Sequence, residues 1–130
     1  MADYFATTRS NYFIVKDIAA FKTWAERRQI EIFENKDHPG KTAIVGCETG
    51  WPVFDDEGDD SNLVSDLSKH LADNQVAILM EAGAEGLRNV AGLATALDST
   101  GRVVEISLYD IYDLARKTFG PHAEITNAEW

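Results

Sequence analysis

The 130-residue sequence predicts a single α+β domain, residues 1–130, in which helices cover one face of an antiparallel sheet. Short β-branched and aromatic runs alternate with segments of helical periodicity, which is typical of mixed folds. Hydrophobic residues make up 45% of the chain, and no linker, internal repeat or low-complexity tract divides it. A chain of this length can bury a core without disulfides or metal.

Residues 11–15 are aromatic and β-branched, which favours a first strand. Asp17 can then cap a helix over residues 18–28. Strands are expected at 30–33 and 42–47, on either side of a segment dense in turn-forming residues. The two strands should therefore pair as a hairpin.

The second helix is expected to begin near residue 61 or 62, because Leu63, Leu67 and Leu71 follow at helical spacing. An uninterrupted apolar run at 76–80 indicates a central strand. Residues 83–86 should then form a turn that ends this strand.

Residues 90–97 are rich in Ala and Leu and could be helical, but Asp98 to Gly101 form a good hairpin turn before the clear strand at 102–106. We therefore expect 90–97 to be a strand paired with 102–106. Ser107 and Asp110 resemble a capping box for a last helix over 108–119, which Gly120-Pro121 should end. The apolar residues expected to face inward from this helix are Leu108, Ile111, Leu114 and Ala115.

The predicted order is βαββαβ followed by ββα. The first six elements match the ferredoxin-like, or split βαβ, order, in which two helices cover one face of an antiparallel sheet. The final hairpin and helix would be a C-terminal extension of that arrangement.

Charge is concentrated in one part of the chain. Residues 51–85 carry one Lys or Arg and nine Asp or Glu, so they supply −8 of the net charge of −10. Five carboxylates occupy the six positions 55–60. A protein that is acidic only for solubility usually spreads its charge over the surface.

The acidic region predicts a binding surface. Asp59, Asp66 and Asp73 are seven residues apart, so on one continuous helix they would form a negative ridge. Trp51 and Phe54 lie beside it and are either core residues or apolar anchors of the interface. The residues predicted to bind a partner are Trp51, Phe54, Asp55, Asp56, Glu57, Asp59, Asp60, Asp66 and Asp73.

Sequence patterns for cofactor or metal chemistry are weak. A calcium loop that began at Asp55 would need Gly at its sixth position and Glu at its twelfth, where the chain has Asp60 and Asp66. The three histidines are not spaced as metal ligands, and no nucleotide-binding or nucleophile motif occurs. We therefore expect no metal, no cofactor and no catalytic residue.

Basic residues are sparse, and Lys22, Arg27 and Arg28 are expected to lie on a solvated helix face. The acidic pI of about 4.6 argues against direct binding to nucleic acid. The single cysteine, Cys47, is expected to be buried and suggests a reducing compartment. No apolar run approaches the length that crosses a membrane, so a cytoplasmic location is expected. The chain is expected to be a monomer or a small homo-oligomer.

Three stretches carry a resemblance to known proteins: Thr8 to Asp17 with Ala20-Phe21 and Trp24-Ala25, then Ala77 to Glu85, and Ser107 to Tyr112. They resemble small acidic proteins of phages, plasmids and other mobile elements. The resemblance implies an inhibitor of host defence, of the anti-CRISPR or antirestriction type, which occupies the basic nucleic-acid channel of a defence complex. It transfers no functional residue. The alternative from another class is a small enzyme or metal-dependent module that uses the clustered carboxylates. A third alternative is an accessory protein that only oligomerises.

Overall fold

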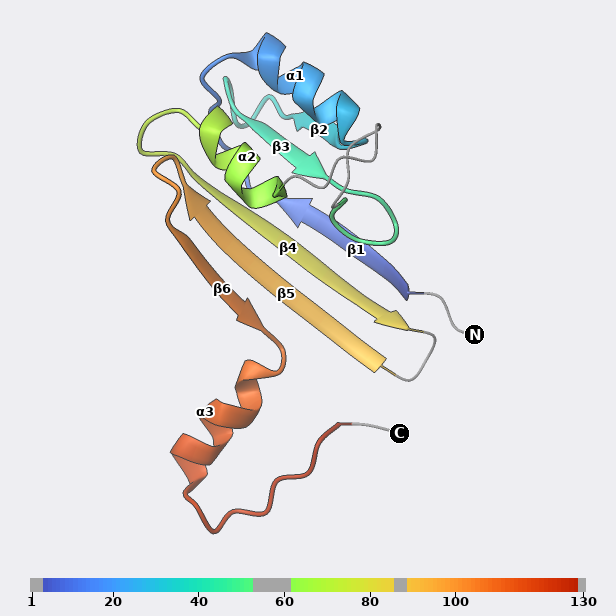
Figure 1. The fold of residues 1–130 in the computed structure, drawn as a ribbon, viewed down its shortest axis with the longest axis vertical. Coiled ribbons are helices and arrows are strands. Elements are labelled where there is room, and N and C mark those ends of the chain that lie inside the picture. Colours follow the sequence, from blue (N-terminus) through green and yellow to red (C-terminus); the bar gives the residue numbers. More distant parts are fainter. Residues whose placement is uncertain (1–3, 53–61, 86–88, 129–130) are drawn as a thin grey trace.

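The computed structural model describes residues 4–52, 62–85 and 89–128 (Figure 1). It is an α+β fold with an antiparallel sheet and three helices. The elements are, in order, β1 (Tyr4–Ser10), α1 (Ile18–Arg27), β2 (Glu31–Glu34), β3 (Thr42–Val45), α2 (Leu63–His70), β4 (Val76–Glu85), β5 (Asn89–Asp98), β6 (Val103–Ser107) and α3 (Asp110–Phe119).

The larger sheet has four strands in the order β1-β4-β5-β6, all antiparallel to their neighbours. In this register Thr8 lies opposite Glu81, and Leu79 lies opposite Thr95. Strands β2 and β3 form a separate two-stranded sheet. The hairpins predicted for β2–β3 and β5–β6 are confirmed.

Strand β3 is joined to the edge of β1 largely through side-chain hydroxyls. Ser10 Oγ accepts a hydrogen bond from the Ile44 backbone N–H at 2.8 Å, and Thr8 Oγ1 accepts one from Gly46 at 2.7 Å. Beyond the end of β1, Phe13 and Thr42 exchange two backbone hydrogen bonds of 2.8 Å. The buried Thr and Ser therefore satisfy backbone donors that would otherwise lack partners.

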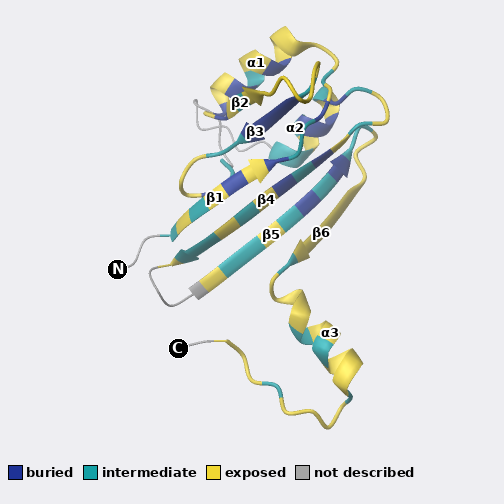
Figure 2. Ribbon diagram, turned by 180° about the vertical axis from the view of Figure 1, so that it is seen from behind, coloured by how far each residue is buried: buried dark blue, intermediate teal, exposed yellow. Residues whose placement is uncertain are grey.

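The core lies between the larger sheet, β3 and the two helices α1 and α2, which cover the same face (Figure 2). Asp17 caps α1 as predicted, accepting from the backbone N–H groups of Ala19 and Ala20. The buried apolar cluster comprises Phe13, Phe21, Ala25, Ile30, Ile44, Leu67, Leu71, Ala77, Leu79 and Leu97. The opposite face of the larger sheet carries no described helix.

Three expectations about the elements were wrong. The first strand was expected at 11–15, but it is Tyr4–Ser10, because these residues pair along β4, whereas Phe13 and Val15 form only isolated bridges. The turn expected at 83–86 also begins too early. Strand β4 continues to Glu85, and Gly83 permits the close approach of β1, since an added Cβ would collide with the Phe5 carbonyl.

Helix α3 also differs from its prediction, because none of its residues is buried. Ile111 and Leu114 are each 58% exposed, so they do not face inward. Only one half of the predicted capping box forms, with the Ser107 backbone N–H donating to Asp110 Oδ2 at 2.7 Å.

Candidate acidic interface

Trp51 is fixed to β4 at the start of the acidic region. Its backbone N–H donates to Glu81 Oε1 at 3.0 Å, and its indole Nε1–H donates to the Met80 carbonyl at 3.2 Å. The side chain is half-buried and packs against the core. Trp51 is therefore a structural anchor that keeps a partly accessible ring.

Glu81 organises this end of the region and is not among the predicted binding residues. Its second oxygen, Oε2, accepts the Tyr4 hydroxyl at 2.9 Å. Burial raises the pKa of Tyr4, and the hydrogen bond to the Glu81 carboxylate raises it further. Gly50, with φ of 115°, lies so close that an added Cβ would be 2.6 Å from Glu81 Oε1. The available signal was one carboxylate inside the apolar run of β4.

The other end of the region is the N-terminus of α2. Asn62 is the cap, and its Oδ1 accepts from the Ser65 backbone N–H at 3.1 Å. Leu67 is fully buried, as predicted from the helical spacing. The acidic segment therefore joins two points that the structure defines, Trp51-Pro52 and Asn62. Six predicted binding residues lie outside the described residues: Phe54, Asp55, Asp56, Glu57, Asp59 and Asp60.

Asp66 does not form part of an outward ridge. Its Oδ2 accepts a hydrogen bond from Arg28 Nη2 at 2.9 Å, and the Arg28 side chain is only 1% exposed. The guanidinium carbon also lies 5.8 Å from the centre of the Trp24 ring. The prediction that Arg28 is solvated was wrong, and Asp66 instead balances a buried cation.

Asp73 is exposed, but it does not continue the helix. Helix α2 has eight residues and ends at His70, and Leu71 takes an extended conformation with φ of −71° and ψ of 136°. The predicted alignment on one helix of Asp59, Asp66 and Asp73 is therefore wrong. Leu71 turns the chain away because it enters the core and bridges to Val15.

Two further side chains near this region have defined environments. His70 packs against Phe21 and Trp24, with ring centres 5.5 and 5.2 Å away. Burial lowers the pKa of His70, nearby Lys16 lowers it too, and Asp66 and Asp17 oppose the shift.

Cys47 is exposed, so its predicted burial was wrong. Its thiol donates to the Gly50 carbonyl at 3.3 Å in a surface turn.

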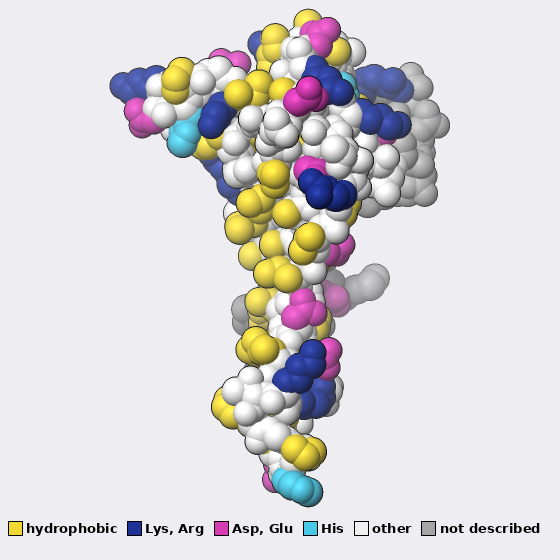
Figure 3. Space-filling model, turned by 90° about the vertical axis from the view of Figure 1, so that its left-hand side faces the viewer, with side chains coloured by type: hydrophobic (Ala, Val, Ile, Leu, Met, Phe, Trp, Pro, Cys, Tyr) yellow, Lys and Arg dark blue, Asp and Glu magenta, His cyan; other side chains and the backbone are white. Residues whose placement is uncertain are grey.

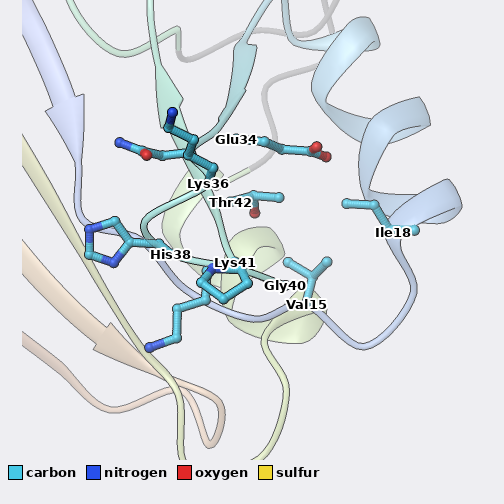
Figure 4. Close-up of a pocket in the computed structure, with 10 residues that line it drawn as sticks. Val15, Ile18, Glu34, Lys36, His38, Gly40, Lys41 and Thr42 are labelled. Atoms are coloured by element: carbon cyan, nitrogen blue, oxygen red, sulfur yellow. The ribbon is translucent and has the colours of Figure 1, made fainter.

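A separate pocket of about 460 Å³ lies between the β2–β3 turn and the start of α1 (Figure 4). Glu34 points across it toward Ile18, whereas Lys41 extends away from it. Its charges are mixed, so it adds nothing to the acidic region. Within the described residues, no group of three His, Cys, Asp or Glu side chains is placed to hold a metal ion.

Comparison with protein-family models, with curated proteins and with solved structures found no significant match. None of the described helices is both long enough and apolar enough to cross a membrane.

Proposed function

We propose that this protein is a stoichiometric inhibitor of a host nucleic-acid-handling defence complex, of the anti-CRISPR or antirestriction type, and that it acts in the cytoplasm. It would bind a basic groove of that complex through the region 51–73. The observation that carries the proposal is the net charge of −8 over residues 51–85, with five carboxylates in positions 55–60.

Clustered carboxylates suit this function because a groove that holds phosphates presents concentrated Lys and Arg. Charge complementarity of this kind raises the association rate and the selectivity for a partner more than the affinity. The proposed surface comprises the carboxylates of 55–60 and the exposed Asp73, beside the half-buried Trp51. Asp66 is paired with Arg28 and is therefore not part of this surface.

We further infer that the first six elements form a ferredoxin-like arrangement. The hydroxyl and backbone bonds between β1 and β3 support the strand order β2-β3-β1-β4. Strands β5 and β6 would then extend the sheet at β4. The two described ends of the acidic segment would both be attached to this arrangement, Trp51 through β4 and Asn62 as the cap of α2.

The test compares two variants with the same change in charge. In one, the five carboxylates of 55–60 become Asn or Gln; in the control, five exposed carboxylates elsewhere do so, at Glu26, Glu31, Asp37, Glu105 and Glu124. The target complex is recovered from host lysate on the immobilised wild-type protein, and association is followed by biolayer interferometry. The first variant should associate at least about ten-fold more slowly than the control at low salt. Equal rates, with melting curves like that of the wild type, would remove the acidic segment from the interface.

A further inference from the structure

The sheet face opposite α1 and α2 is apolar, and no described part of the chain covers it (Figure 1). Met80, Val104 and Ile106 project from it and are 56%, 69% and 61% exposed. Together with Ala82 and Ala94 they belong to a shallow apolar surface, whose groove measures about 410 Å³. Glu81 also borders the groove, but its carboxylate is bonded to Tyr4 and Trp51 on the opposite face of the strand.

Helix α3 carries a second apolar surface that nothing in the described chain covers. Ile111, Leu114 and Phe119 are 58%, 58% and 72% exposed, and Ala115 completes their stripe. The other side of the helix is charged and includes the Asp113–Arg116 ion pair of 3.2 Å. An amphipathic helix of this kind gains most of its stability by burying its apolar stripe against a partner.

Local contacts direct α3 away from its own sheet. The Leu108 backbone N–H donates to the Gly92 carbonyl at 3.0 Å. The Leu108 side chain lies over Gly92 so closely that a Cβ there would be 2.7 Å from Leu108 Cγ. With the bond between Ser107 and Asp110, these contacts set the direction in which α3 leaves the sheet (Figure 1). To cover its own sheet, α3 would have to break them.

Seen from the β6 side, hydrophobic side chains follow the sheet and continue onto α3 (Figure 3). Strand β6 is an edge strand, and Val104 and Ile106 are exposed on the open face, where they lie opposite Ala96 and Ala94 of β5. An exposed apolar surface of this kind marks an interaction site or else promotes aggregation. A specific partner for this surface is therefore expected.

We propose that the partner is a second copy of this chain, with α3 of each copy lying on the open sheet face of the other. A two-fold arrangement of this kind buries both apolar surfaces, the sheet face and the α3 stripe, at the same time. It also closes on itself, so it does not extend into a filament. The chain supplies both halves of the contact, which is why a second copy is a better occupant than an unrelated protein.

The available area fits a stable dimer. Nine apolar side chains contribute to the two surfaces, and each is 52–72% exposed. They are Phe5, Met80, Val90, Val104, Ile106, Leu108, Ile111, Leu114 and Phe119. A Val, Leu, Ile, Phe or Met side chain presents roughly 60–120 Å² of apolar surface when fully exposed. The apolar area is therefore about 500 Å² per copy, or about 1,000 Å² for two, close to the apolar share of a standard interface of about 1,600 Å².

The first experiment measures the mass of the full-length chain by sedimentation equilibrium from about 1 to 100 µM. We expect a species of twice 14.4 kDa. Ile111→Glu on the apolar stripe should weaken dimerisation at least about ten-fold. Lys117→Gln on the charged side of α3 makes the same change in charge and should leave the dimer intact. A wild-type chain that stays at the mass of one copy overturns the proposal.

The second experiment tests the exchange itself by mixing two variants. One carries Ile111→Glu and Leu114→Glu on α3, and the other carries Val104→Glu and Ile106→Glu on the sheet. Each alone should be monomeric, because both of its contacts are damaged, but the mixture should form a heterodimer that keeps one intact contact. A dimer of the α3 variant alone would indicate sheet-to-sheet contact, and a dimer of the sheet variant alone would indicate contact between α3 helices. Either result overturns the exchange.

Circular dichroism of each variant controls for folding, and all four substituted side chains are exposed, so the monomers should keep the spectrum of the fold. A mixture that remains monomeric while both variants are folded also overturns the exchange. A monomeric wild type that binds phosphatidylcholine vesicles would assign the open face to lipid instead. None of these substitutions alters residues 51–73, so the outcome is independent of the proposed inhibition.

Discussion

Replacement of Asp66 by Lys tests whether this carboxylate is structural. The substitution removes the acceptor of the 2.9 Å bond from Arg28 and places a second cation beside a guanidinium that is only 1% exposed. A surface carboxylate in a binding ridge would tolerate the change, whereas the partner of a buried cation should not.

The magnitude follows from the burial of the two partners. Breaking a fully buried ion pair costs about 3–5 kcal/mol of unfolding free energy. The Asp66 side chain is 27% exposed, and Arg28 has further interactions in the fold, so both facts reduce the loss. We expect Asp66→Lys to cost about 2–3 kcal/mol and Asp66→Asn, whose amide oxygen can still accept, about 1–2 kcal/mol.

Urea unfolding followed by circular dichroism gives these free energies directly. The control is Asp73→Lys, which makes the same change in charge at an exposed position and should alter stability by no more than about 0.5 kcal/mol. If Asp66→Lys and Asp73→Lys have the same unfolding midpoint and slope, Asp66 does not support Arg28, and the outward ridge becomes the better interpretation.

Two other predictions concern pH. Asp98→Ala should lower the melting temperature, because this carboxylate accepts from the Thr100 hydroxyl at 2.7 Å and from Arg102 Nε at 2.6 Å. The hydrogen bond from Thr100, then those from Arg102, hold the pKa of Asp98 well below its ordinary 3.8, so the difference between variant and wild type should persist above that pH and shrink in stronger acid. For His70, burial lowers the pKa below the ordinary 6.5, so protonation favours the unfolded chain. Stability should therefore fall as the pH drops below 6.5, and His70→Gln should reduce that fall; identical pH profiles would exclude His70 as the cause.

The elements that the sequence predicted well are those specified by near neighbours. Asp17 bonds to N–H groups two and three residues away, and Leu63 and Leu67, which are one helical turn apart, both lie on α2. The turn at Asp98 is equally local, since its carboxylate bonds to the second and fourth residues that follow. Signals of this range are complete within a short window of sequence.

The features that could not be predicted from the sequence depend on partners far along the chain. Strand β1 is polar at Thr8 and Ser10, and it forms because β4 and β3 lie on either side of it. Arg28 is buried beside Asp66, 38 residues later in the chain, which supplies a counter-charge that no short window of sequence contains. The apolar stripe of α3 was correctly identified as a stripe, but periodicity cannot show whether a stripe faces its own core or another chain.

The two proposed surfaces should respond to salt in opposite directions, which separates one proposal from the other. Association of the acidic segment with a basic groove depends on attraction between unlike charges, so added salt should weaken it. Two copies that each carry a net charge of −10 repel one another, whereas their proposed contact is apolar, so added salt should preserve or strengthen the dimer. Sedimentation equilibrium and interferometry, each at about 0.05 M and 0.5 M salt, measure the two effects on the same protein. Target binding that is insensitive to salt would reject the acidic interface, and a dimer that dissociates at high salt would reject the apolar exchange.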